Sequence, residues 1–227
     1  MTKTQAMRSL KAVGTAQNRK IYRRHGGQGE YYGVSWAELG KLKKKIKVDH
    51  NLALELWATG NGDARALATL VADADAMKRT EIDSWAKDLD SYGMVDCFAA
   101  LVCRTRFVKP CMKKWRSSKS EWMGQAGWWL ASYLAKDDDT YTNEEMIAWL
   151  EDIEANIHTA KNRVRHSMNG ALISIGVRNA TLKRKAIAAA KRIGKVDVDH
   201  GETGCKTPDA VAYIEKTLAH RKARKNA

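Results

Sequence analysis

The sequence predicts an all-α protein, built as a helical-repeat solenoid with a basic concave face. Only two prolines occur in 227 residues, whereas all-β folds need many turn residues. Apolar residues recur at helical spacing along nearly the whole chain, and the breaks between runs carry helix start and stop residues rather than long linkers. Short amphipathic helices must bury their apolar faces on neighbours, which favours stacked helical pairs. A compact helical bundle is the competing arrangement.

Side chains that cap helix N-termini mark the predicted helices in the first half of the chain. Each predicted capping residue stands directly before a run of apolar residues at helical spacing, or in the first turn of that run. In chain order, the expected elements are Ser35 with Trp36–Ile46, the run Leu52–Ala58, Asp63 with a run holding Leu67, Leu70 and Val71, Thr80 with Ile82–Leu89, and Ser91 with Met94–Val102.

The second half of the chain carries further start signals. Ser118 opens a long segment, Ser120–Ala135. Thr142 and Glu145 form a capping box before a helix over Met146–Ile157. Thr207-Pro208-Asp209, with proline at the first helical position, predicts a last helix that runs to about Arg221.

The whole chain, residues 1–227, is expected to form a single α-helical repeat domain. Residues 196–206 break the helical pattern and bring Asp197, Asp199, His200 and Cys205 close together in sequence. Their spacing matches no metal signature, so we expect an ordered cap for the last helix, with no metal and no cofactor. The basic residues of 222–227 are expected to form a flexible tail.

Positive charge is concentrated in bands. The formal net charge is +14, and the stretch from residue 161 to 195 carries ten Lys and Arg without one Asp or Glu. Residues 1–47 hold twelve basic and two acidic residues, and residues 104–119 hold seven and none, while 48–103 and 136–160 are net acidic. Such one-signed bands indicate a polyanionic partner, and double-stranded DNA is the leading one.

Other classes of protein are disfavoured. No run of eighteen apolar residues occurs and no secretory signal is visible, so we expect no membrane span and a cytoplasmic location. Four cysteines without Cys-x-x-Cys spacing are expected to be reduced thiols. No feature demands a protein partner, so a monomer is expected.

Several short segments resemble the AlkD-like DNA alkylation repair family. They are Ser91-Tyr92-Gly93-Met94-Val95-Asp96, Lys113-Lys114-Trp115-Arg116-Ser117-Ser118, Trp122-Met123-Gly124-Gln125-Ala126, Tyr32-Gly33-Val34 and Leu56-Trp57. The resemblance covers roughly residues 20–195. It implies a HEAT-like repeat fold with a basic cleft for duplex DNA. It also implies a DNA glycosylase of base excision repair that excises cationic N3- or N7-alkylated purines.

The resemblance places an aromatic residue and an aspartate beside the lesion, and Tyr92 and Asp96 occupy those positions. Residues i and i+4 share a helix face, so the ring can contact the cationic base while the carboxylate stabilises positive charge on the deoxyribose. Where active members carry an arginine, this chain has Gln125. Where they place a further cleft tryptophan, it has Asn169-Gly170-Ala171.

Further DNA contacts are expected from three parts of the chain. Trp122, Ala126, Trp129 and Tyr133 share one helix face and predict core packing, which leaves Trp128 as a cleft-facing ring. Trp36, Trp85 and Trp149 are interpreted as packing between helices. The remaining candidates are basic residues expected to contact DNA: Lys113, Lys114, Arg163 and Arg165.

The departures from the family pattern leave alternatives open. The favoured function is a glycosylase for alkylated purines. The first alternative is a catalytically silent member that binds distorted or branched DNA. The second is a helical-repeat scaffold whose basic groove holds an acidic protein.

Overall fold

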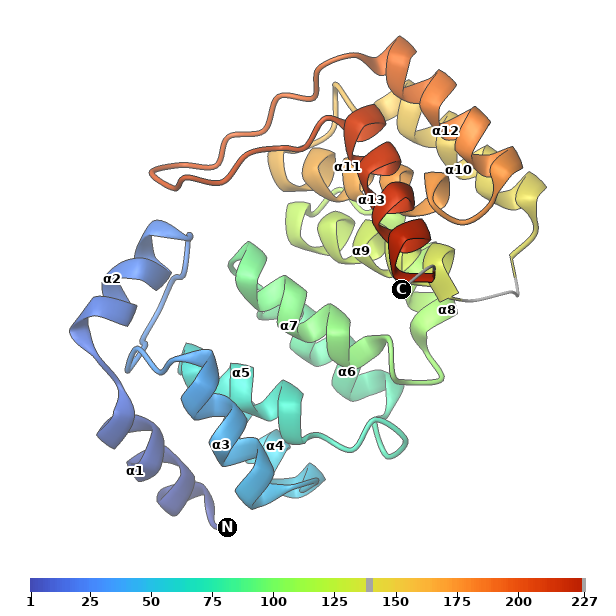
Figure 1. Cartoon of the computed structure of the whole chain (residues 1–227). Coiled ribbons are helices and arrows are strands. Elements are labelled where there is room, and N and C mark those ends of the chain that lie inside the picture. The colour runs from blue at the N-terminus through green and yellow to red at the C-terminus, as the bar shows by residue number, and fades with distance from the viewer. Residues whose placement is uncertain (138–140, 226–227) are drawn as a thin grey trace. The chain divides into compact units, whose positions relative to one another are not determined.

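A computed structural model describes residues 1–137 and 141–225 of the chain. Within these residues there are thirteen α-helices and no β-strand, which confirms the predicted all-α class (Figure 1). The helices group into two compact units. Unit 1 comprises residues 1–109 with Gly201–Thr203, and unit 2 comprises residues 110–200 with Gly204–Ala227.

Unit 1 is built around one helix that is buried almost all round. The helix α5 (Gly62–Val71) packs against four others of this unit, and eight of its ten residues are buried. A helix buried nearly all round is typical of the centre of a helical domain. The other helices of unit 1 are α1 (Lys3–Val13), α2 (Ala16–Arg24), α3 (Trp36–Ile46), α4 (His50–Trp57), α6 (Arg79–Lys87) and α7 (Tyr92–Val102).

Unit 2 follows the same plan around α11 (Asn162–Gly176). This helix packs against α9 (Glu121–Asp137), α10 (Asn143–Asn156), α12 (Ala180–Ile193) and α13 (Ala210–Lys225). The remaining helix, α8 (Val108–Arg116), begins two residues before the boundary of unit 2. Gly124 and Val164 show how closely α9 and α11 approach, because a Cβ atom at Gly124 would lie 2.9 Å from Val164 Cγ2.

Helix starts agree with the capping signals at several predicted positions. Ser35 accepts a hydrogen bond from the Glu38 amide at the start of α3, and Thr142 and Glu145 form the predicted capping box of α10. Other starts differ by a few residues. The side chain of Asn61, not Asp63, caps α5, because Asp63 points back to another segment.

The last helix also begins later than predicted. Asp209 Oδ1 accepts a hydrogen bond from the Ala212 amide, so α13 starts at Ala210 and Pro208 lies before it. Residues 222–225 continue α13, and residues 226–227 lie outside the described part of the chain. Residues 194–209, which include the predicted segment 196–206, form a long non-helical connection between α12 and α13 (Figure 1).

Candidate functional site

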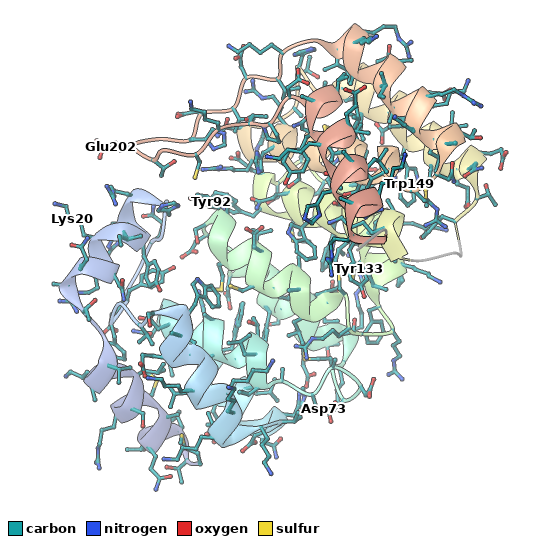
Figure 2. All side chains as sticks on the ribbon, viewed as in Figure 1. Lys20, Asp73, Tyr92, Tyr133, Trp149 and Glu202 are labelled. Atoms are coloured by element: carbon teal, nitrogen blue, oxygen red, sulfur yellow. The ribbon has the colours of Figure 1, made fainter. Side chains whose placement is uncertain are left out.

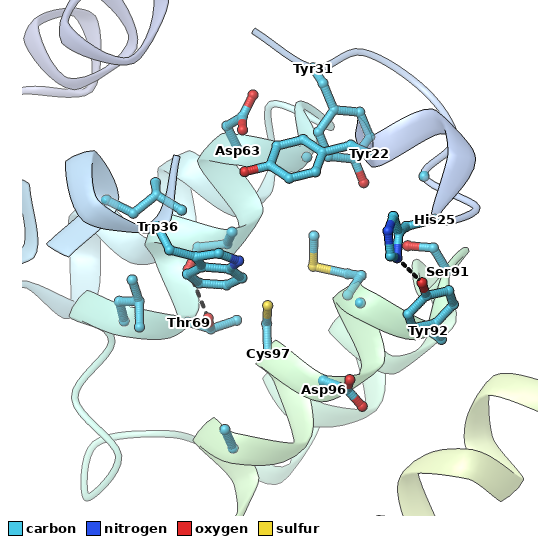
Figure 3. A pocket seen from close by; sticks show the side chains of 18 of the residues that line it. Tyr22, His25, Tyr31, Trp36, Asp63, Thr69, Ser91, Tyr92, Asp96 and Cys97 are labelled. Atoms are coloured by element: carbon cyan, nitrogen blue, oxygen red, sulfur yellow. Dashed lines mark hydrogen bonds between the residues drawn. The ribbon is translucent and has the colours of Figure 1, made fainter. Parts of the chain in front are cut away.

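A cavity of about 840 Å³ opens in unit 1 among α2, α3, α5 and α7. A cavity of this size falls within the range that small-molecule and cofactor sites occupy in proteins. Figure 3 shows Tyr22 and Tyr31 on one side, Trp36 on a second and His25 with Tyr92 on a third, while Cys97 points into the space. Aromatic rings therefore stand on several sides of the cavity, among aliphatic and polar residues.

Buried hydrogen bonds fix the segment that carries Tyr31 to the central helix. The carboxylate of Asp63, on α5, accepts hydrogen bonds from the amides of Tyr32, Gly33 and Val34 at 2.6, 2.9 and 3.0 Å. Burial raises the pKa of the Asp63 carboxyl, and these three amide N–H groups oppose that shift by stabilising the charged form. The same helix therefore builds the core of unit 1 and positions a wall of the cavity.

Two tyrosine rings of this wall are held rigidly. The Tyr22 hydroxyl donates a hydrogen bond to the Val34 carbonyl, and burial raises its pKa to about 12. Tyr31 lies directly on Gly62, where a Cβ atom would come within 2.1 Å of its ring. The two rings contact each other with centroids 5.6 Å apart. Only glycine at position 62 leaves room for this arrangement.

The helix α7 presents two different faces to the cavity. Cys97 is part of the wall, and burial raises the pKa of its thiol to about 12, so it is not a thiolate nucleophile near neutral pH. Gly93, Asp96 and Ala100 also line the cavity but are exposed, and they follow one another at i, i+3 and i+7. The Asp96 carboxylate thus stands at the mouth between two small residues, with open space above Gly93.

Tyr92 begins α7 and lines the same cavity. Its hydroxyl forms a hydrogen bond with His25 Nδ1, and the two rings lie 5.9 Å apart (Figure 3). The structure therefore brings Tyr92 and Asp96, both expected at the site, to one cavity.

Comparisons with known proteins identify the family. A family model described as "DNA alkylation repair enzyme" matches residues 6–214. The chain belongs to this family. The match confirms the resemblance found in the sequence.

Similar proteins match over most of their length. An uncharacterized protein of Listeria innocua serovar 6a, Lin0241, is 32% identical over 213 residues, which are 91% of this chain and 93% of the relative. Lmo0209 of Listeria monocytogenes serovar 1/2a is 30% identical with the same coverage.

A solved structure is similar to nearly the whole chain. It comes from a family of proteins related to the HEAT-like repeat DNA glycosylases with affinity for branched DNA structures. It is 28% identical, covers 97% of this chain and 95% of its own, and has a TM-score of 0.89. The predicted HEAT-like fold is therefore confirmed.

Within this alkylation repair fold, two predicted contacts on α9 are wrong. Trp128 is 0% exposed and Gln125 is 3% exposed, so neither offers a surface to DNA. The physical reason lies in the small residues Gly124, Gly127 and Ala131, which let α9 approach its neighbours closely. A Cβ atom at Gly127 would lie 2.3 Å from an α8 amide nitrogen, so the helix face that holds Trp128 is the packed one.

The aromatic stripe of α9 is correspondingly less buried than predicted. Of its members only Ala126 is fully buried; Trp122 and Trp129 are half-buried and Tyr133 is 39% exposed. Tyr133 is labelled in Figure 2. Trp128 instead lies beside the Arg116 guanidinium, which is 4.8 Å from its ring and 5.0 Å from that of Trp149. The row of small residues in the sequence was the signal for this orientation.

Three other tryptophans were expected to pack between helices. Trp85 and Trp149 are buried, and Trp85 stacks on Trp57 with centroids 4.1 Å apart, as predicted for packing residues. For Trp36 the prediction is wrong, because Trp36 is 57% exposed and lines the cavity. It stands at the first position of α3, beyond the helix turns that pack on α5. Sequence reasoning missed Trp36, Tyr22 and Tyr31 as cavity residues.

Of the four basic residues predicted to contact DNA, two are exposed and two take part in hydrogen bonds within the protein. Lys113 and Lys114 are exposed on α8. Arg165 is half-buried and donates a hydrogen bond to the Asp197 carbonyl at 2.9 Å, so it holds the 194–209 connection. The amide of Arg163 donates to Glu121 Oε1 at 2.7 Å, which joins α11 to the start of α9.

The 194–209 connection is fastened to α11 by several polar contacts. Asn162 exchanges two hydrogen bonds with the Asp199 backbone, at 2.7 and 2.8 Å, and Asn169 donates to the Pro208 carbonyl. Within residues 1–137 and 141–225 there is no group of three or more His, Cys, Asp and Glu residues that could hold a metal ion. In the same described residues, no helix has the length and apolar character required to cross a membrane.

Proposed function

We propose that this protein binds DNA and prefers distorted or branched duplexes to linear ones. The observation that carries the proposal is the similarity over 97% of the chain, at a TM-score of 0.89, to a protein whose family has affinity for branched DNA structures. Membership of the DNA alkylation repair family supports DNA as the partner.

The distribution of charge supports the same partner. The exposed lysines of α8, Lys113 and Lys114, lie in a stretch that contains seven basic residues and no acidic one. In unit 2, α12 exposes Arg184, Lys185 and Lys191. Lysine and arginine at a surface attract phosphates through charge and release condensed counterions, which favours binding without reading sequence.

A competition experiment tests the proposal. The protein is titrated with a fluorescent four-way junction, a three-way junction and a linear duplex of matched sequence and length, at several salt concentrations. We expect the junctions to bind at least about tenfold more tightly than the duplex, a difference of about 1.4 kcal/mol. Equal affinity for all three would contradict the preference. Stronger binding to an acidic polypeptide than to DNA would favour the scaffold function instead.

Excision of cationic N3- or N7-alkylpurines is the second candidate function. It is favoured by the exposed Asp96 carboxylate, which stands between Gly93 and Ala100 at the mouth of the cavity. Loss of such a base leaves positive charge on the deoxyribose, and a carboxylate that can approach the sugar closely stabilises this charge. The departures from the family pattern at Gln125 and at Asn169-Gly170-Ala171, together with the burial of Gln125 and Trp128, place this activity second.

A further inference from the structure

We propose that the unit 1 cavity captures a nucleobase that has left the base stack, with Trp36 as its stacking platform. This proposal rests on the proposed binding of distorted or branched DNA, because such DNA contains bases that are unpaired or easily unpaired. The chemical group that the cavity would bind is the flat ring of the nucleobase.

The walls of the cavity suit a flat aromatic ring. Tyr22 is fixed by its bond to Val34 and Tyr31 by its contact with Gly62, so both rings are held in place before any ligand enters. Trp36 faces the open space from a second side (Figure 3) and is 57% exposed, which leaves much of its indole free to stack. Stacking on aromatic side chains tolerates every base, because each base has a π-face.

Two basic residues among those that line the cavity suit the phosphates of a nucleotide. Lys43 and Arg104 are exposed residues that line the cavity, and they can attract the phosphates on either side of an extruded base. Arg104 is oriented by a hydrogen bond of 2.9 Å from its guanidinium to the Thr69 carbonyl. An aromatic interior with cations among its lining residues is the combination used by proteins that hold single-stranded nucleic acid.

The edge of α7 that lines the cavity is exposed. Gly93, Asp96 and Ala100 form the exposed edge of α7, and two of the three lack any side chain beyond Cβ. Gly93 touches nothing that would require a glycine, since a Cβ there would meet open space. Glycine at this exposed position leaves room for another backbone to approach closely. A sugar-phosphate backbone lying on this edge would bring its extruded base to Trp36.

The test uses photocrosslinking together with binding. The full-length protein is mixed with a duplex that carries one unpaired 5-iodouracil, irradiated, and the crosslinked peptide is mapped. We expect the crosslink at Trp36, Tyr22 or Tyr31. We also expect the bulged duplex to bind about tenfold more tightly than its fully paired counterpart, as stacking of one base supplies.

Two variants and one control separate base capture from general DNA binding. Trp36→Ala removes the platform, and Ala100→Phe narrows the mouth at an exposed position that does not disturb the core. Both variants should lose the tenfold preference for the bulge, so that bulged and paired duplexes bind each variant with equal affinity. Tyr213→Ala removes another exposed ring, 49% exposed on α13, and should keep the tenfold preference.

The possible results distinguish base capture from DNA binding in general. Crosslinks that map only outside the cavity, or a bulge preference that survives in both variants, would overturn base capture while DNA binding stands. If the wild-type protein binds none of the DNA substrates, the proposed function fails and base capture fails with it. Loss of the bulge preference in Trp36→Ala and in Ala100→Phe, with the preference kept in Tyr213→Ala, supports the proposal.

Discussion

The hydroxyl of Tyr92 forms a hydrogen bond with Nδ1 of His25, which ties the first residue of α7 to the residue that follows α2. The two residues are 67 positions apart in the sequence, and both line the cavity. Tyr92 therefore has a structural role in closing one end of the cavity, in addition to any contact with a lesion that the family resemblance implies.

Tyr92→Phe should separate these two roles. The substitution removes the hydroxyl and its bond to His25 but keeps the ring. We expect the free energy of unfolding to fall by about 1 kcal/mol, the usual net contribution of one hydrogen bond, measured by urea denaturation. DNA affinity should change less than twofold. A large loss of affinity without a loss of stability would show that the hydroxyl itself contacts DNA.

Asp63→Asn should destabilise unit 1 more strongly. The substituted amide offers one acceptor oxygen where the carboxylate serves three amide N–H groups, so at least one buried donor loses its partner. A loss of about 2–3 kcal/mol in the free energy of unfolding is expected. Asp83→Asn is the matched control: Asp83 pairs with Arg79 at a position 40% exposed, where ion pairs contribute little. Equal effects of the two substitutions would contradict the role of Asp63.

The fold was predictable because its signals are local. Ser35 before α3 and the Thr142–Glu145 box before α10 act through hydrogen bonds within one turn, and the structure contains both. The orientation of α9 was not predictable from hydrophobicity alone, since Trp122, Trp128 and Trp129 are equally apolar. Which tryptophan is buried depends on how closely another helix approaches, and Gly124 and Gly127 decide that.

The cavity was less accessible to sequence reasoning. Tyr92 and Asp96 are one helical turn apart, so their common face could be foreseen. Tyr22, Tyr31 and Trp36 join them only because Asp63 holds the 32–34 backbone against α5, a contact across about thirty residues that no local pattern encodes.

Stability should depend on pH through His166 and His200. Burial lowers the pKa of His166, and the charges of His200 and Arg163 lower it further. Burial and the charge of Arg163 lower the pKa of His200, whereas the charge of Asp199 opposes this shift. The rings lie 5.5 Å apart and join α11 to the 194–209 connection. Below the unfolded pKa of about 6.5, the unfolded chain binds more protons than the folded one, so stability is lost as pH falls.

The measurement compares unfolding at pH 7.5 and pH 5.5. Wild-type protein should lose stability over this interval, and His166→Gln should lose less of it, because one of the groups that charges on unfolding is gone. His220→Gln, at an exposed position of α13, is the control and should behave as wild type. Identical pH dependence in all three proteins would exclude His166 as the source.

Binding of DNA should weaken steeply with salt if Lys113 and Lys114 contact phosphates. With about five to eight contacts, the logarithm of the binding constant should fall against that of the salt concentration with a slope of roughly −4 to −7. Replacing both lysines by alanine should make the slope shallower by about 2. The control, Lys78→Ala with Lys87→Ala, removes equal charge from the net-acidic segment 48–103 and should leave the slope unchanged. Equal slopes for both double variants would exclude α8 from the interface.

Asp96→Asn tests excision directly. The substitution keeps the shape of the side chain at the mouth of the cavity and removes the negative charge that would stabilise a cationic sugar. If the protein releases N3- or N7-alkylpurines from a defined duplex, the rate should fall by about a hundredfold or more, as expected for a principal electrostatic group. Affinity for the same duplex should not fall, because the lost charge repels phosphates. Equal release by both proteins would remove Asp96 from the chemistry. If wild-type protein releases no base but binds junctions tightly, DNA recognition without excision is its function.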